Sequence, residues 1–133
     1  MRILGIDHGT VRIGLALSDE LGWTAQPLPF IETAQAARIA EIVEERAVTK
    51  IVVGRPRNMD GSYGRADDAV KEFVANLRSL VSIPIELWDE RLTTSQANRV
   101  LIEGNVSRAE RKKKVDSMAA QLMLQSYLDA HAG

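Results

Sequence analysis

The chain has 133 residues, of which 45% are hydrophobic and 26% are charged, and its formal net charge is −1. This length suffices for one hydrophobic core and is short for two, so we expect a single domain over residues 1–133. No apolar run approaches the about 18 residues of a membrane helix, and the N-terminus lacks the layout of a secretory signal. We therefore expect a soluble, intracellular protein with no membrane partner. The absence of cysteine excludes disulfides and thiolate metal sites.

The first predicted elements are the two strands of a β-hairpin. Residues 3–7 form an apolar run that ends in Asp7, and residues 11–18 alternate large side chains with small or polar ones after a turn at residues 8–10. Strict alternation is typical of a half-buried strand. Asp7 is thus a lone carboxylate at the mouth of the hairpin, where functional side chains are commonly carried by a rigid scaffold.

The next predicted elements are an edge strand and a helix. Residues 23–31 contain two prolines, which cannot donate to a strand ladder, so this strand is expected at the edge of the sheet or partly irregular. Thr33 is expected to cap a helix over residues 34–47, whose apolar residues recur at helical spacing on one face.

Further strands and helices alternate along the rest of the chain. The pattern predicts, in order, a buried strand at residues 50–54, a glycine-rich loop at 55–64, a helix at 66–80 and another buried strand at 84–88. It then predicts a helix from Thr93 to about Gly104, a mobile loop or frayed helix start at 106–113, and a helix over about 114–130. Because hairpin partners are antiparallel and helical crossovers enforce parallel pairing, we predict a three-layer α/β fold with a mixed sheet.

Three carboxylates stand in positions that burial rules disfavour. Asp7 ends the first strand and Glu90 follows the last predicted strand, and ligands of α/β sheets bind outside such strand ends. The alternatives are a turn role for Asp7 and a helix-dipole role for Glu90. Asp116 falls in an apolar arc of the final helix, so we expect it to have a basic partner, a helix-terminal amide or a cation shared with the other acids.

A shared cation would explain all three acids together. Oxygen ligands without cysteine or clustered histidine suit Mg²⁺ or Mn²⁺, which can activate water and stabilise a phosphoryl transition state. Basic residues form two clusters in the sequence. Each cluster is either a set of solvated loop charges or a set of contacts to substrate phosphates. They are Arg55, Arg57 and Arg65 around the glycine-rich loop, and Arg108, Arg111, Lys112, Lys113 and Lys114 before the final helix. The combination favours metal-assisted phosphodiester hydrolysis.

Four segments resemble, in order and spacing, those of the bacterial YqgF family, also called RuvX or Holliday junction resolvase-like: residues 5–19, 51–61, 89–94 and 114–128. The resemblance implies a ribonuclease H-like fold with a central five-stranded mixed sheet flanked by helices. It also implies a nuclease that acts in the cytoplasm on the 5′ end of precursor 16S ribosomal RNA, or on branched DNA.

The resemblance further implies the residues of the site. The catalytic acids and ligands of Mg²⁺ or Mn²⁺ are expected to be Asp7, Glu90 and Asp116, with Asp89 as a candidate fourth acid. The residues expected to bind the nucleic-acid substrate are Arg12, Arg55, Arg57, Arg91, Lys112, Lys113 and Lys114. Two other functions are compatible with the sequence: a non-catalytic nucleic-acid-binding module of the same fold, and a nucleotide-binding protein, because the opening hairpin also resembles that of sugar kinases and actin-like ATPases.

Overall fold

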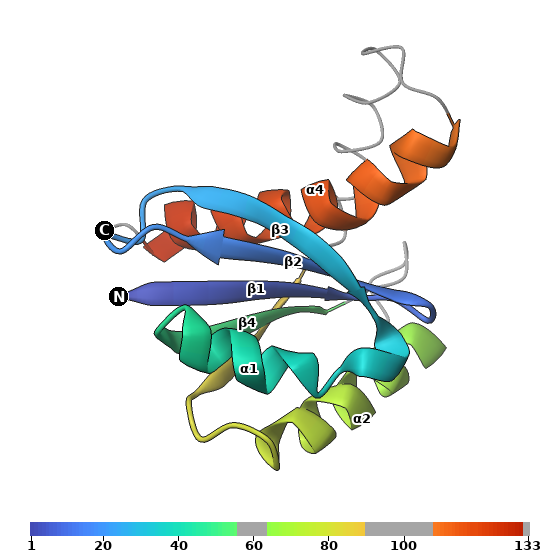
Figure 1. Ribbon diagram of the computed structural model, residues 1–133, viewed down its shortest axis with the longest axis horizontal. Coiled ribbons are helices and arrows are strands. Elements are labelled where there is room, and N and C mark those ends of the chain that lie inside the picture. The colour runs from blue at the N-terminus through green and yellow to red at the C-terminus, as the bar shows by residue number, and fades with distance from the viewer. Residues whose placement is uncertain (56–63, 90–107, 132–133) are drawn as a thin grey trace.

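A computed structural model of the chain describes residues 1–55, 64–89 and 108–131, with side chains described outside residues 108–117 (Figure 1). Within these residues the fold centres on a five-stranded sheet of order β3-β2-β1-β4-β5. The strands are β1 (Arg2–His8), β2 (Arg12–Ser18), β3 (Ala25–Glu32), β4 (Val48–Arg55) and β5 (Ile85–Asp89). β2 pairs antiparallel with β1 and β3, whereas β4 pairs parallel with β1 and β5. The predicted mixed sheet is confirmed, with the proline-containing β3 at an edge. β5 forms the other edge and is only partly buried, so its prediction as a buried strand was wrong.

Helices cover both faces of the sheet. The described ones are the short 3₁₀ helix η1 (Thr33–Gln35), α1 (Arg38–Glu45), α2 (Arg65–Arg78) and α4 (Arg108–His131). α1 and α2 lie on one face and α4 lies on the other, which gives the three predicted layers (Figure 1). No helix within the described ranges is both long and apolar enough to cross a bilayer.

Strand alternation divides the hydrophobic core into two clusters, one on each face. Ile6, Ile13 and Val53 belong to the cluster under α1 and α2, which also contains Phe73 and Leu77 of α2. The second cluster lies under α4. Its buried members are Ile3, Ala16, Ala25, Val52, Ala120, Met123, Leu124, Tyr127 and Leu128. Because alternate residues of a strand point to opposite faces, these two sets also show which face each neighbouring polar side chain occupies.

Two glutamines of α4 hold the helix against the edge strand β3. The Gln125 Oε1 atom accepts a hydrogen bond from the Ala25 amide at 2.9 Å, and the Gln121 amide donates to the Ala25 carbonyl at 3.1 Å. Gln125 also donates to the Trp23 carbonyl at 2.9 Å. These side chains therefore satisfy backbone groups that an edge strand would otherwise leave to water or to another chain.

The start of α1 differs from the prediction. The helix begins at Arg38 rather than at residue 34, and Thr33 makes no capping hydrogen bond. Instead, the Thr33 hydroxyl donates to the Gly9 carbonyl at 2.7 Å, and its amide donates to the Val11 carbonyl at 2.9 Å. The prediction of Thr33 as a helix cap was wrong because the hydroxyl is used to tie this segment to the hairpin turn.

The start of α4 also differs. It begins at Arg108, so residues 108–113 are helical. Of the two predicted alternatives for this segment, a helix start agrees with the structure and a mobile loop does not. Lysine, arginine and glutamate are good helix formers, so a segment without an apolar period can still be helical. The helix predicted from Thr93 to Gly104 and most of the predicted glycine-rich loop lie outside the described residues.

Candidate functional site

Asp7 lies near the C-terminal end of β1, on the face of the sheet that α4 covers. It pairs with Gly14 of β2, and it follows Ile3 and Gly5 in the alternation that places every second side chain on this face. The residue is half-buried. β1 therefore presents a carboxylate near its C-terminal end, on the face that α4 covers. The sequence predicted Asp7 at the end of the first strand, and its catalytic role stays a prediction.

Glycines flank Asp7 on both neighbouring strands. Gly14 is its partner on β2. On β4, Val53 pairs with Ile6, so Gly54 is the next residue beside Asp7, and Gly54 in turn pairs with Trp88 of β5. The direct cross-strand neighbours of Asp7 are therefore glycines on both strands. This arrangement suits a carboxylate that must reach a cation or a phosphate.

The direction of α4 brings its N-terminal half toward Asp7. Leu124 packs on Gly5, and Leu128 belongs to the same cluster as Ile3, so α4 runs antiparallel to β1 (Figure 1). Asp116 lies in α4 two helical turns before Leu124, in the direction of the Asp7 end of the sheet. Its side chain and the whole of Glu90 are outside the described parts of the chain, so their meeting with Asp7 stays a prediction.

Asp89 occupies the other face of the sheet. It ends β5, and the preceding alternate residue, Leu87, packs against the cluster under α1 and α2. Asp89 is therefore poorly placed to share a cation with Asp7. Among the residues whose side chains are described, no three His, Asp or Glu side chains lie close enough together to hold a metal ion.

Arg55 ends β4 and forms an ion pair with Asp67 of α2. The Arg55 Nε atom lies 2.7 Å from Asp67 Oδ1, and Lys71 Nζ lies 3.4 Å from Oδ2. Hydrogen bonding by Arg55 holds the pKa of the Asp67 carboxyl below its usual value, although burial acts in the opposite direction. The sequence did not predict this structural role, because Asp67 carried no signal apart from its position in the first turn of a helix. A phosphate contact of Arg55 stays a prediction.

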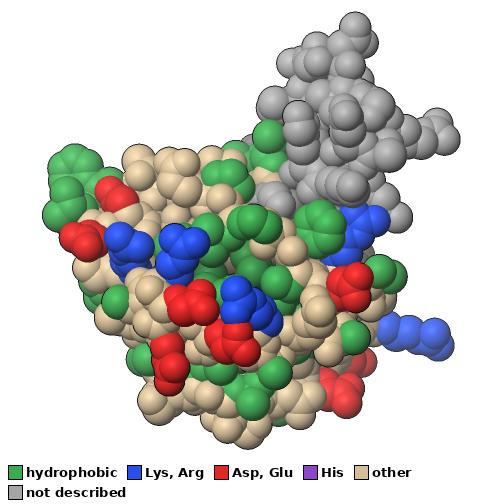
Figure 2. Space-filling model, viewed as in Figure 1, with side chains coloured by type: hydrophobic (Ala, Val, Ile, Leu, Met, Phe, Trp, Pro, Cys, Tyr) green, Lys and Arg blue, Asp and Glu red, His purple; other side chains and the backbone are tan. Residues whose placement is uncertain are grey.

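Arg12 starts β2 on the same face as Asp7, since it alternates with Gly14 and Ala16. Its guanidinium carbon lies 5.2 Å from the centre of the Phe30 ring, a distance suited to a cation–π contact. The basic and acidic side chains on the face seen in Figure 2 are interspersed around hydrophobic ones, so the part drawn in colour has no continuous basic surface. Arg57, Arg91 and the side chains of Lys112, Lys113 and Lys114 lie outside the described residues.

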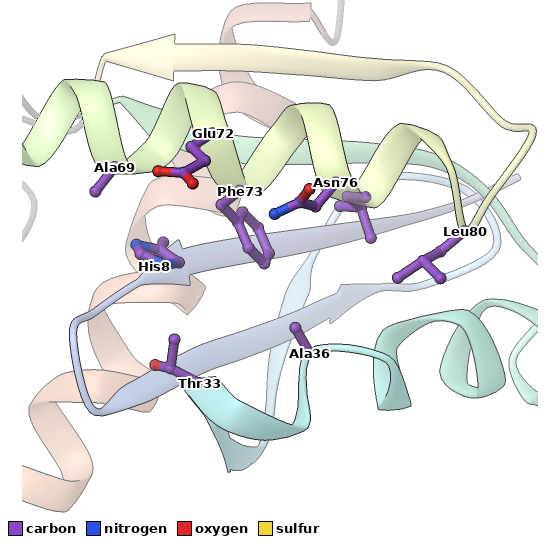
Figure 3. A pocket seen from close by; sticks show the side chains of 9 residues that line it. His8, Thr33, Ala36, Ala69, Glu72, Phe73, Asn76 and Leu80 are labelled. Atoms are coloured by element: carbon purple, nitrogen blue, oxygen red, sulfur yellow. The ribbon is translucent and has the colours of Figure 1, made fainter.

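A pocket lies on the face of the sheet opposite to the Asp7 side chain, and His8, the residue after Asp7, lines it. His8 alternates with Asp7 and packs against Phe73 of α2, with ring centroids 4.7 Å apart. Burial lowers the pKa of His8 below its ordinary value. Together with residues of η1 and α2, this pair lines a cavity of about 270 Å³ (Figure 3). Sequence reasoning missed it. The sequence predicted His8 in the turn at residues 8–10, whereas β1 extends to His8 and directs its side chain to this face.

Comparison with known proteins identifies the family. A family model described as RuvX, Holliday junction resolvase, matches residues 1–130. The chain belongs to the RuvX family. It is 49% identical over 135 residues to a protein of Pelotomaculum thermopropionicum named "Putative pre-16S rRNA nuclease", with 98% of this chain and 88% of the relative covered. A relative of the same name in Bacillus thuringiensis is 47% identical over 136 residues, with 98% of this chain and 99% of the relative covered.

Solved structures share the fold of this RuvX family member at low identity. T. thermophilus RuvC, in complex with a Holliday junction substrate, superposes with a TM-score of 0.59 at 17% identity, covering 100% of this chain and 97% of that one. The Fowlpox virus resolvase, in complex with Holliday junction DNA, gives a TM-score of 0.60 at 12% identity, with 100% of both chains covered. These likenesses confirm the ribonuclease H-like fold that the sequence resemblance implied.

Proposed function

We propose that this protein is a metal-dependent endonuclease that hydrolyses phosphodiester bonds during 5′-end maturation of precursor 16S ribosomal RNA in the cytoplasm. Membership of the RuvX family and the names of relatives at 47–49% identity support the reaction and the substrate. The observation that carries the proposal is the position of Asp7, at the C-terminal end of β1 with a glycine on each neighbouring strand.

The proposed ligands of the metal ion are Asp7, Glu90 and Asp116. Hard oxygen donors are the ligands that Mg²⁺ and Mn²⁺ prefer, and the half-buried carboxylate of Asp7 fits that chemistry. When bound, such an ion supplies Lewis-acid stabilisation of phosphoryl charge and lowers the pKa of a bound water. The chain itself contributes the strand β1, which carries Asp7, and a glycine beside Asp7 on each neighbouring strand.

Basic residues are proposed to hold the phosphates that flank the cut bond. Arg12 has the clearest structural support, because it lies on the same face of the sheet as Asp7. Arg57, Arg91 and the lysines at positions 112–114 are proposed from the sequence. Arg55 is a weaker candidate, since its guanidinium already binds the Asp67 carboxylate.

The test compares the parent protein with Asp7→Asn on two substrates, precursor 16S ribosomal RNA and a four-way DNA junction, with and without Mn²⁺. We expect metal-dependent cleavage of the RNA by the parent and a loss of roughly a thousandfold or more in Asp7→Asn, because electrostatic stabilisation of the transition state is the main contribution of such sites. Asp68→Asn is the matched control, an exposed acid on α2 that should cleave like the parent. Equal activity of Asp7→Asn and the parent would refute the proposal.

A second candidate substrate is a branched DNA junction. It is favoured by the description of the RuvX family model and by the fold shared with RuvC. Cleavage of the four-way junction in preference to the RNA would assign this substrate instead. A non-catalytic binding module would bind RNA and cleave neither substrate at any concentration of Mg²⁺ or Mn²⁺.

A further inference from the structure

We propose that the pocket between η1 and α2 binds an unpaired guanine base of the nucleic-acid substrate. This inference rests on the proposed function, because it assumes a nucleic-acid strand at the end of β1. It adds a base-reading subsite on the face of the sheet opposite to the Asp7 carboxylate.

The size and walls of the pocket suit a single heterocyclic base. Its volume is about 270 Å³, below the about 300 Å³ at which pockets for drug-sized ligands begin. Ala36 and Leu80 line it, and Leu80 keeps 46% of its surface exposed. An apolar side chain that is left exposed at the wall of a cavity gains burial when a flat ring enters.

Two aromatic side chains line the pocket, the half-buried His8 and the buried Phe73. The His8 and Phe73 rings are 4.7 Å apart and tilted by 38°. Single-stranded nucleic acids are commonly held by bases that stack on such aromatic side chains.

The polar groups at the pocket select the base. Glu72 and Asn76 lie one helical turn apart on α2 and border the pocket on the side opposite Ala36, with His8 and Phe73 between them (Figure 3). A carboxylate accepts hydrogen bonds only, and an amide both donates and accepts. Guanine offers two neighbouring donors, N1–H and the 2-amino group, beside the O6 acceptor. Adenine, cytosine and uracil do not present two adjacent donors, so the Glu72 carboxylate favours guanine.

The hairpin turn connects this pocket to the candidate site. Asp7 and His8 are consecutive in β1, so their side chains leave opposite faces at the same end of one strand. Thr33, which lines the pocket, donates its hydroxyl hydrogen bond to Gly9 immediately after His8. A strand that crosses this end of the sheet can therefore place a phosphate near Asp7 and an adjacent base at His8.

The first experiment measures binding without cleavage. The full chain, in the absence of divalent metal, is titrated with a labelled oligoadenylate that carries one central guanosine, and with the same oligomer carrying adenosine, inosine or 2-aminopurine there. We expect the guanosine oligomer to bind roughly tenfold more tightly than the adenosine one, as a bidentate base contact provides. Inosine lacks the 2-amino group and 2-aminopurine lacks N1–H, so both should bind more weakly than guanosine.

Glu72→Gln tests the assignment to this pocket. Glu72 is exposed, so the variant should fold, and it should bind the guanosine and adenosine oligomers alike. Glu44→Gln, an exposed acid on α1 that does not line the pocket, is the matched control and should keep the preference. Guanosine should also shift the ring resonances of Phe73 in the parent and not in Glu72→Gln.

The two proposals fail in different measurements. Absence of any guanosine preference in the parent, or a preference that Glu72→Gln retains, overturns the guanine subsite even if the protein cleaves RNA. A failure to cleave with Mg²⁺ or Mn²⁺ overturns the nuclease, whereas a preference that Glu72→Gln abolishes would still support the subsite. A parent that binds none of the oligomers overturns the subsite as well.

Discussion

Arg55 donates hydrogen bonds to both carboxylate oxygens of Asp67, from Nε to Oδ1 at 2.7 Å and from Nη2 to Oδ2 at 3.2 Å. The Asp67 side chain is 1% exposed, and that of Arg55 is 26% exposed. The pair joins the last residue of β4 to the first turn of α2. It therefore fixes the end of the strand next to β1, beside the candidate site, from the opposite face of the sheet.

We predict that Asp67→Asn destabilises the protein at neutral pH by roughly 2 kcal/mol. The loss should be below the about 3–5 kcal/mol of a fully buried pair, because Arg55 is partly exposed to water. Chemical denaturation measures it. Asp68→Asn, an exposed acid at the next position, should leave the free energy of unfolding nearly unchanged.

The same pair predicts a pH dependence. The pKa of Asp67 is lowered in the folded protein, mainly by hydrogen bonding from Arg55, so its contribution to stability is complete well above the ordinary value of 3.8. It should be lost as the pH falls below that value and through the folded-state pKa. The stability difference between parent and Asp67→Asn should therefore narrow in acid, and a constant difference down to the lowest measurable pH would contradict the assignment.

Gly5→Ala should disturb the packing of α4 on the sheet. A Cβ atom at residue 5 would lie 2.8 Å from the Leu124 Cβ, a distance too short for two carbon atoms, so the helix must move. We expect a loss of about 1–3 kcal/mol in the free energy of unfolding, typical of overpacking in a core. Since Asp7 is two residues further along β1, cleavage should also fall. Unchanged stability would mean that α4 can shift freely.

Ala47→Gly should stabilise the protein. Ala47 follows α1 with a φ of 53°, in the left-handed region that costs an alanine about 1 kcal/mol and costs glycine little. Thermal and chemical denaturation should show a gain of roughly 0.5–1 kcal/mol. Ala40→Gly, inside α1, is the control of opposite sign and should lose a similar amount. Destabilisation by both changes would contradict the role of the backbone angle.

His8 should make the stability fall in mild acid. Burial lowers its pKa from the ordinary 6.5, so the unfolded chain takes up a proton at this residue before the folded protein does. The contribution of the neutral His8 side chain to the free energy of unfolding is complete well above pH 6.5. It is lost as the pH falls from 6.5 through the folded-state pKa of His8. His8→Phe keeps an aromatic ring against Phe73 and should lack this component. Parallel pH profiles of parent and His8→Phe would contradict it.

Removal of charge at Lys112, Lys113 and Lys114 should weaken RNA binding in a salt-dependent way. If all three lysines contact phosphates of single-stranded RNA, the triple substitution to glutamine lowers the slope of log affinity against log salt by about 2. Fluorescence anisotropy at several salt concentrations measures this slope. Arg46→Gln, an exposed charge after α1, is the control. An unchanged slope would remove these lysines from the interface.

Periodicity in the sequence predicted the layers, the mixed sheet and the position of Asp7, because alternation and helical spacing report directly on burial. Side chains that bind distant backbone were not predictable in this way. Thr33 has the residue type of a helix cap, but a carbonyl at Gly9 takes its hydroxyl hydrogen bond. In the sequence, Asp67 is an ordinary acidic residue in the first turn of a helix, and its contact with Arg55 arises only from the tertiary fold. The acids at 90 and 116 rest on sequence alone.

The face of the sheet that carries Asp7 is covered by α4, whose residues are distant in the chain from the strands that they contact. Ala25 of β3 binds Gln125, which lies 100 positions later, and Gly5 packs on Leu124. During synthesis β1, β2 and β3 emerge long before α4, so their apolar surface stays uncovered until α4 has left the ribosome. A nascent chain therefore cannot complete the Asp7 side of the sheet until α4 has been made and has left the ribosome.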